Sequence, residues 1–130
     1  MGDAVRGKVL LDVINALTPD YQLALGCTAS GAEELQKKAP QAKVVKAFNA
    51  VFALNMSTGA VKGEKFTLFV AGDDMAAKGL VLSARKVIGF DPVDAGPLTN
   101  ARRMETLGYF NIQLGYTPNM GAEIGFKLVH

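Results

Sequence analysis

Residues 89–105 read Gly-Phe-Asp-Pro-Val-Asp-Ala-Gly-Pro-Leu-Thr-Asn-Ala-Arg-Arg-Met-Glu, and they indicate a strand, a turn and the start of a helix. Asp91–Ala95 predicts a short strand. Pro92 favours an edge position or the first residue of that strand, because proline cannot donate to a sheet. Gly96 and Pro97 turn the chain, and a helix is expected over residues 100–116. Its inward face would hold Met104, Leu107, Phe110 and Leu114.

Three earlier segments also have the composition of short buried strands. The first, Lys8–Ile14, is apolar on both faces, which is typical of a parallel strand covered on both sides. The other two are expected at Lys43–Phe48 and Phe66–Ala71. Between them, Ala50–Met56 indicates a short helical turn, and the Gly- and Lys-rich segment Ser57–Lys65 predicts a flexible loop.

Two further helices fit between these strands. Ser30 and Glu33 form a capping box, in which the hydroxyl accepts from a free helix N–H group and Glu33 reaches back. That helix is expected to end before Pro40. Asp73 or Asp74 predicts the start of the next helix. Its apolar stripe consists of Ala77, Leu80, Val81, Ala84, Val87 and Ile88.

Strands and helices therefore alternate along the chain, and Gly121–Val129 adds a closing strand or a tail. This order predicts a single α/β domain over residues 1–130, with a mostly parallel sheet and helices on both faces. In such open sheets, ligands bind outside the carboxyl ends of the strands. The turns that follow the strands are the places to look for a site.

Composition argues against several functional classes. The net charge of +2 is too small to argue for nucleic acid or an anionic membrane as a partner. Cys27 and His130 are the only cysteine and histidine, so no intrachain disulfide can form and no metal site is expected. No signal peptide opens the chain and no apolar run approaches a membrane span, which favours a cytoplasmic protein. No Ser–His–Asp set or catalytic carboxylate pair can be assembled, so no catalytic residue is assigned.

Five short motifs occur in order along the chain. They are Asp12-Val-Ile-Asn15-Ala16-Leu17, Ser30-Gly-Ala-Glu33, Val44-Val-Lys-Ala-Phe-Asn49, Gly72-Asp-Asp-Met-Ala-Ala-Lys78, and Val93-Asp-Ala-Gly-Pro-Leu98 followed by Ala101, Arg102 and Glu105. Together they resemble the deazaflavin-dependent NADP oxidoreductases, and the reductase domain of STEAP-type metalloreductases is similar. Members typically carry a proline where this chain has Ala16. The resemblance runs from about Gly7 to Leu128.

This resemblance implies a partial Rossmann-like fold that corresponds to the second half of these reductases. The first half of the family carries a Gly-x-Gly-x-x-Gly turn that holds the nucleotide, and the 130 residues do not contain that pattern. NADP and a deazaflavin or flavin are therefore expected only if a nucleotide-binding half is supplied, by a separate partner or by residues outside this sequence. The chain alone is not expected to bind NADP tightly, because glycine-turn amides hold the pyrophosphate in this family.

The resemblance also implies that the loops after the first two strands lie beside the nicotinamide and the deazaflavin. Cofactor binding is thus predicted for Asn15, Ala16, Phe48 and Asn49, with the asparagine amides orienting a ring. The alternative is that both asparagines only satisfy loop backbone groups. The alternative for Phe48, which its apolar strand context favours, is a core position rather than a stacking surface.

Arg102 and Arg103 lie in the first turn of the predicted last helix, where cations oppose the helix dipole. One explanation is an internal carboxylate, Glu105 or Asp94, that compensates the charge. The other is that Arg102 binds the phosphate or carboxylate of a ligand, which makes it the predicted anion-binding residue.

Two functions follow from these observations. The first is a reductase-related domain, the substrate and deazaflavin side of an NADP-dependent oxidoreductase, which is not catalytic alone. The second is a stand-alone oligomeric module that binds a small ligand or assembles, without catalysis. A homodimer is expected through Lys8–Ile14, because this strand would expose unpaired backbone groups and apolar side chains at an open edge.

Overall fold

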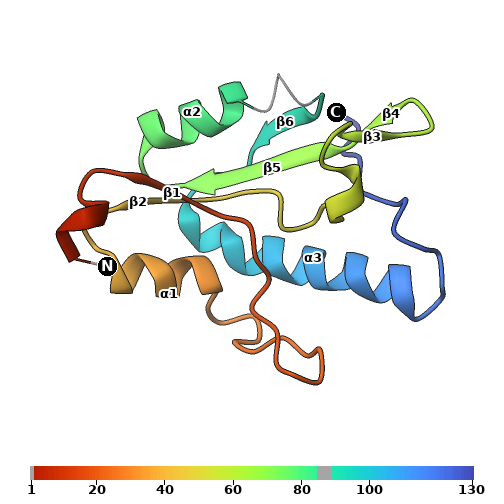
Figure 1. Cartoon of the computed structure of the whole chain (residues 1–130), viewed down its shortest axis with the longest axis horizontal. Helices are drawn as coiled ribbons and strands as arrows, with labels where there is room; N and C mark the ends of the chain where they lie inside the picture. Colours follow the sequence, from red (N-terminus) through yellow and green to blue (C-terminus); the bar gives the residue numbers. More distant parts are fainter. Residues whose placement is uncertain (1, 85–88) are drawn as a thin grey trace.

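A computed structural model describes residues 2–84 and 89–130 of the chain. The main sheet has four strands in the order β1–β2–β5–β6 (Figure 1). These strands are β1 (Val9–Asp12), β2 (Lys43–Lys46), β5 (Thr67–Gly72) and β6 (Asp91–Asp94). A separate two-stranded hairpin consists of β3 (Ala60–Val61) and β4 (Glu64–Lys65).

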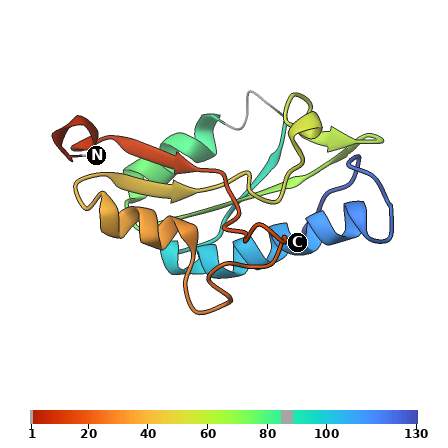
Figure 2. The ribbon, with the colours of Figure 1, turned by 60° about the horizontal axis from the view of Figure 1, so that its bottom comes forward.

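Helices cover both faces of the sheet. The three α-helices are α1 (Gly31–Lys38), α2 (Met75–Ala84) and α3 (Ala101–Tyr116), and shorter 3-10 turns span Gly2–Val5, Ala53–Asn55 and Leu98–Asn100. Figures 1 and 2 show α2 on one side of the sheet and α1 and α3 together on the other. The predicted α/β architecture is therefore confirmed. None of the helices within residues 2–84 and 89–130 combines the length and apolar character needed to cross a lipid bilayer.

The starts of α1 and α2 follow the predicted caps. Ser30 Oγ accepts from the Glu33 amide at 3.1 Å and donates to Glu33 Oε2 at 2.8 Å, as in a capping box. Asp74 Oδ1 accepts from the Ala77 amide at 2.9 Å, and this hydrogen bond lowers the pKa of the Asp74 carboxyl. Asp73 has a different role, since its Oδ1 accepts from the Leu98 amide at 2.9 Å and joins two turns.

One strand direction departs from the parallel pattern. The pairs β1–β2 and β5–β6 are parallel, whereas β2 and β5 run antiparallel. Parallel neighbours need a crossover across the sheet, which is usually a helix. The chain between β2 and β5 holds only a 3-10 turn and the β3–β4 hairpin. It remains at one end of the sheet, so β5 runs back alongside β2.

The prediction of a flexible loop over Ser57–Lys65 was wrong. This segment contains the β3–β4 hairpin, in which Ala60 lies opposite Lys65. The turn residues Lys62 and Gly63 both have positive φ, at 51° and 80°, as a tight type I′ hairpin turn requires. Lysine is an uncommon residue at such a φ, which is why the turn was not predicted from sequence.

The inward face of α2 is also rotated from the prediction. Ala77 and Val81 are buried as expected, but Leu80 is 64% exposed, and Ala84 is exposed too. Lys78 is buried in its place, with Nζ 2.8 Å from Asp94 Oδ1. The helix carries apolar residues on all sides, so their spacing could not fix which side faces the sheet. The predicted stripe residues Val87 and Ile88 lie outside the described residues.

The last helix has the predicted extent but an unusual buried face. Met104 points inward, whereas Phe110 is 53% exposed, contrary to expectation. The buried residues of α3 are Ala101, Met104, Glu105, Gly108, Asn111 and Gly115. Beyond α3 the chain forms an extended tail rather than a closing strand, tied to β5 where the Thr67 amide donates to the Phe126 carbonyl at 2.9 Å. Small and polar residues on α3 thus let it approach the loops that follow β1 and β2.

The apolar core is divided by the sheet. Neighbouring residues of a strand point to opposite faces, and Val45 packs in the cluster beneath α2 while Val44 packs in the cluster beneath α1 and α3. Phe66, Leu68 and Phe90 are buried in the first cluster. An apolar cluster therefore packs on each face of the sheet. This packing fixes the polar loops that follow β1 and β2 relative to α3.

Candidate functional site

Two loops of matching spacing leave the carboxyl ends of β1 and β2. Asp12 lies opposite Lys46 in the parallel register, and each is followed three residues later by an asparagine, Asn15 or Asn49. Asn15 Nδ2 donates to the Asn49 carbonyl at 2.8 Å, and Asn49 Nδ2 donates to Asn15 Oδ1 at 3.0 Å. The fold thus brings together the two asparagines that the sequence places after the first two strands.

Beneath this amide pair lies a buried charged layer. Lys46 is 0% exposed, and its Nζ lies 2.9 Å from Asp12 Oδ2 and 2.9 Å from Glu105 Oε1. It also donates to the Ile14 carbonyl. The two carboxylates are almost as deeply buried, with side chains 5% and 4% exposed. Charged groups are rarely buried to this degree unless they are paired and hydrogen-bonded.

The helix α1 compensates the second carboxylate. One ammonium group faces two carboxylates, so the layer carries an excess negative charge. Glu105 accepts from the amides of Gly31 and Ala32, at 3.1 and 3.4 Å, at the start of α1. A helix N-terminus favours negative charge because its first N–H groups are unpaired and its dipole is positive there. The charged layer therefore fixes β1, β2, α1 and α3 to one another.

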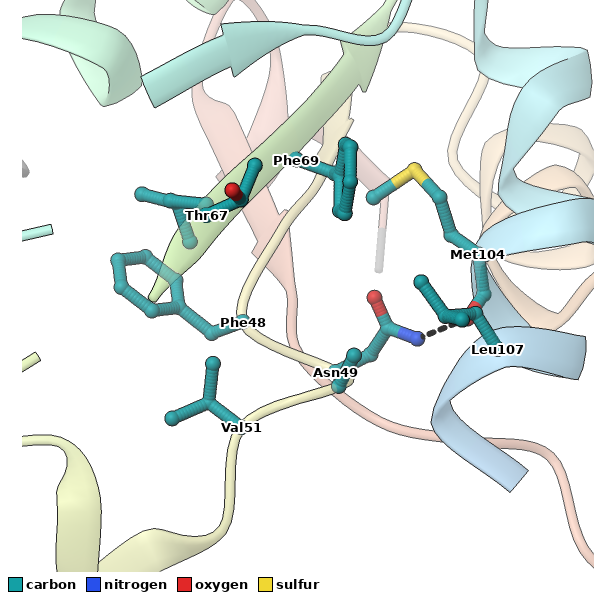
Figure 3. Close-up of a pocket in the computed structure, with 9 residues that line it drawn as sticks. Phe48, Asn49, Val51, Thr67, Phe69, Met104 and Leu107 are labelled. Carbon is teal, nitrogen blue, oxygen red and sulfur yellow. Dashed lines mark hydrogen bonds between the residues drawn. The ribbon is translucent and has the colours of Figure 1, made fainter. Parts of the chain in front are cut away.

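One turn further along α3, the helix supports the amide pair. Asn49 Nδ2 donates to the Met104 carbonyl at 2.6 Å, and Figure 3 shows this amide directed at α3. Gly108 faces the pair without a side chain. A Cβ atom at Gly108 would lie 2.5 Å from Asn15 Oδ1 and 2.8 Å from Asn49 Nδ2, closer than atoms can approach. The amide pair is thus built on the absence of a side chain at this position.

An open cavity of about 330 Å³ lies against the amide pair. Asn15, Asn49 and Asn111 contribute amide groups to its wall, and none of the described residues that line it is charged. Phe52 and Tyr116 add aromatic surface and contact each other edge to face, with ring centroids 6.0 Å apart. Its size falls within the range of about 300–1,000 Å³ that is usual for small-molecule sites. The chemistry of the wall suits an uncharged ring that can hydrogen-bond.

The other two predicted cofactor-binding residues do not line this cavity. Phe48 contacts Phe90 edge to face at 5.6 Å, on the core side of the loop. Next to it is an internal void of about 10 Å³, lined also by Asn49, Phe69 and Met104 (Figure 3). That void has room for about one water molecule and no larger ligand. Ala16 contributes its carbonyl, which accepts from the Ala24 amide at 2.8 Å.

Arg102 has a carboxylate partner, but a different one from those expected. Its Nε lies 2.9 Å from Glu33 Oε2 and its Nη2 lies 2.8 Å from Glu33 Oε1, a two-point contact. This hydrogen-bonded guanidinium lowers the pKa of the Glu33 carboxyl. The expected partners were wrong, because Glu105 is bound to Lys46 and Asp94 to Lys78. Anion binding by Arg102 remains a prediction, and an incoming ligand would have to compete with Glu33.

Two residues that hold the site together, Lys46 and Gly108, were not predicted from the sequence. Lys46 stands in the apolar run Val-Val-Lys-Ala-Phe of a strand expected to be covered on both faces. That position alone could have indicated a paired, buried cation. Gly108 had no comparable signal, because a glycine inside a helix indicates close contact without showing with what.

Known reductases resemble this chain in sequence. No model of a known protein family matches the chain. The chain is 36% identical to the rat (Rattus norvegicus) metalloreductase STEAP3 over 107 residues, which is 82% of this chain and 21% of that protein. It is 30% identical to the human (Homo sapiens) metalloreductase STEAP2 over 101 residues, 78% of this chain and 19% of that protein. The chain therefore spans about a fifth of the length of the curated relatives it matches.

Solved structures extend the similarity to the fold. One is a protein of Arthrobacter sp. FB24, provisionally assigned as an F420-dependent NADP reductase, with a TM-score of 0.89 and 34% identity over 97% of this chain and 60% of that chain. Another is a hypothetical protein of Sinorhizobium meliloti, with a TM-score of 0.63 and 31% identity over 72% of this chain and 47% of that one. The resemblance to the deazaflavin-dependent NADP oxidoreductases is thus confirmed over most of the chain, which matches one part of these reductases.

Proposed function

We propose that this chain forms the ring-binding side of an NADP-dependent oxidoreductase, and that it acts together with a dinucleotide-binding half. The observation that carries the proposal is the amide pair of Asn15 and Asn49 at the wall of the uncharged cavity. The relatives named as an NADP reductase and as metalloreductases support it. None of the described residues at this wall forms an acid–base pair, so the proposed contribution is binding and orientation.

The residues of the cavity fit the cofactors that this proposal needs. A nicotinamide, a deazaflavin or a flavin would bring a planar ring whose edge both donates and accepts hydrogen bonds. Asn15 is only partly buried and reaches the cavity from one loop, while Asn49 holds it in place from the other. The bound cofactors would supply the hydride chemistry, and these residues would orient the ring and limit access of water.

A titration with riboflavin tests the proposal, because riboflavin presents the ring without a phosphate. We expect saturable quenching of its fluorescence by the chain combined with a dinucleotide-binding half. Asn15→Ala should weaken binding by roughly three- to tenfold, the value of one net hydrogen bond. Gln41→Ala is the matched control, because it removes an exposed amide at the opposite end of β2. With that half present, binding that is unchanged in Asn15→Ala, or absent with the wild-type chain, would contradict the proposal.

A second candidate function is favoured by the open edge of β1. This strand has β2 on one side and no strand of the described residues on the other. Leu11, Val13 and Ile14 are 42%, 46% and 63% exposed. In this alternative, the chain assembles as a homo-oligomer and binds a small ligand without hydride transfer. Self-association together with no binding of NADPH or flavin, even when a nucleotide-binding half is added, would favour it.

A further inference from the structure

A second cavity, of about 380 Å³, lies on the other side of Asn111 from the amide pair. It is an open cavity lined by the β3–β4 hairpin, the end of α3 and the tail over residues 120–127. Its wall is predominantly apolar, formed by Val61, Phe66, Leu114, Met120, Ile124 and Phe126. The size and the apolar wall are those of a small-molecule site.

The walls of this cavity are fixed by hydrogen bonds. Asn55 is 2% exposed, and its Nδ2 donates to the Ala122 and Ile124 carbonyls at 2.8 and 3.3 Å. The Leu128 amide donates to Thr67 Oγ1 at 2.7 Å. These contacts hold the tail beside Phe66 and Leu114. The cavity is therefore formed by hydrogen-bonded parts of the fold.

Lysines stand at the mouth of the cavity. Lys127 is paired with Glu64 across the opening, between the tail and the hairpin. Lys62 and Lys65 are exposed and make no ion pair with any residue in the described parts of the chain. Glu123 also lines the cavity, so its charged lining residues are three lysines and two glutamates. This excess of cations beside an apolar interior is complementary to an amphipathic anion. The cavity beside Asn15 and Asn49 differs, because no charged residue lines it.

We propose that this second cavity binds an aliphatic carboxylic acid. The hydrocarbon chain lies against the apolar wall, and the carboxylate lies between Lys62 and Lys65 at the mouth. Burial of the chain supplies the affinity, since each CH2 group removed from water contributes a similar increment. The lysines supply selectivity for an acid over an uncharged molecule of the same length. The ligand is distinct from the ring expected at the amide pair.

Calorimetric titration of the full chain with decanoate, octanoate and 1-decanol tests this. Decanoate is expected to bind with one equivalent per chain. Octanoate, which lacks two CH2 groups, should bind roughly tenfold more weakly. 1-Decanol should bind more weakly than decanoate at low salt, and this difference should disappear in the double variant Lys62→Met/Lys65→Met. The control is Lys8→Met/Lys38→Met, which removes two exposed lysines elsewhere and should leave the difference intact.

Leu114→Trp, designed to fill the cavity, should abolish binding of all three probes while leaving riboflavin binding unchanged. The lysine variants keep the test valid if this larger change impairs folding, because both lysines are exposed. Three results would overturn the proposal: no saturable binding of decanoate at millimolar concentration, equal affinity for decanoate and 1-decanol, or an acid preference that survives in Lys62→Met/Lys65→Met.

Discussion

At the residue scale, the central feature is a single buried lysine between two carboxylates. Lys46 contacts Asp12 and Glu105, and Glu105 also accepts from the first amides of α1. A buried ion pair is weak evidence for stability as such, because desolvation offsets the attraction. Removal of one partner is different, since it leaves the opposite charge buried without compensation. This asymmetry makes the role of Lys46 testable.

Lys46→Met should destabilise the chain by roughly 3–5 kcal/mol, because both Asp12 and Glu105 remain buried without their cation. The free energy of unfolding in urea measures the effect. Lys37→Met is the control; its side chain is 71% exposed in a surface pair with Glu34, and its loss should leave the free energy of unfolding nearly unchanged. Equal stability of the two variants would show that the charged layer has no structural role.

Glu33 gives a pH-dependent prediction. The hydrogen-bonded Arg102 lowers the folded-state pKa of Glu33 below its ordinary value of 4.5. A lowered carboxyl pKa contributes stability above the unfolded pKa, and this contribution is lost as the pH falls through the folded value. Glu33→Gln should therefore lower the melting temperature at pH 7, and the difference from wild type should shrink below about pH 4.5.

Arg102 allows the same pair to be tested from its other side. If Glu33 is its main partner, Arg102→Ala should lower the melting temperature without changing the affinity for phosphate-bearing ligands. Glu34→Gln is the control for the removal of a neighbouring carboxylate in the same turn of α1. Loss of ligand binding with unchanged stability in Arg102→Ala would assign this residue to an external anion instead.

At the element scale, the packing of α3 depends on two glycines that have no side chain. Its buried face includes Gly108 and Gly115, which let the helix approach Asn15 and Phe52 more closely than a side chain would allow. Glycine inside a helix costs about 0.5–1 kcal/mol relative to alanine. At Gly108 that cost is offset, because the close approach of α3 permits the amide pair. Substitution by alanine should therefore lower stability at Gly108 and raise it at a helix glycine that contacts nothing, such as Gly79.

Gly108→Ala should destabilise the chain by about 1–3 kcal/mol, despite the better helix propensity of alanine, because the new Cβ atom would displace Asn15 and Asn49. Riboflavin binding should be lost with it. Gly79→Ala in α2 is the matched control, since nothing lies within 4 Å of its new Cβ atom. It should stabilise by about 0.5–1 kcal/mol. Thermal and urea unfolding of both variants would separate propensity from packing.

Much of the fold could be predicted from the sequence at this scale. The positions of β1, β2, β5, β6 and α3 follow from apolar runs and turn residues, and the start of α1 from its capping box. The rotation of α2 could not be predicted, because apolar residues surround it. The direction of β5 could not be predicted either, since it depends on how a short connection packs and not on composition.

Part of the candidate site could also be predicted from the sequence, and part of it could not. Asn15 and Asn49 could be placed at one end of the sheet because both follow strands that were expected to be parallel. Lys46 was missed because lysine is usually a surface residue, although its place in an apolar run could have indicated a buried cation. Gly108 and Glu105 act through α3, and only the packing of that helix against β1 and β2 reveals what they contact.

At the scale of the whole molecule, the sheet has two unequal edges. The edge strand β6 carries Pro92, which suits a position where one backbone side has no partner strand. At the other edge, β1 carries the exposed Leu11, is followed by the exposed Val13 and Ile14, and contains no proline. Proteins usually protect such an edge, because it can pair with another chain. The β1 edge is therefore the expected interface.

We predict that the chain forms a dimer through the β1 edge. Pairing of two copies would satisfy unpaired backbone groups and cover Leu11, Val13 and Ile14, and two-fold association is the commonest arrangement of oligomers. Light scattering at micromolar concentration should give about twice the chain mass of 13.7 kDa. Leu11→Lys places a charge at the interface and should yield the monomer. Leu80→Lys alters an exposed leucine on α2 and should leave the dimer intact. A wild-type mass of 13.7 kDa, or equal dissociation by both substitutions, would show that the β1 edge does not pair with a second copy.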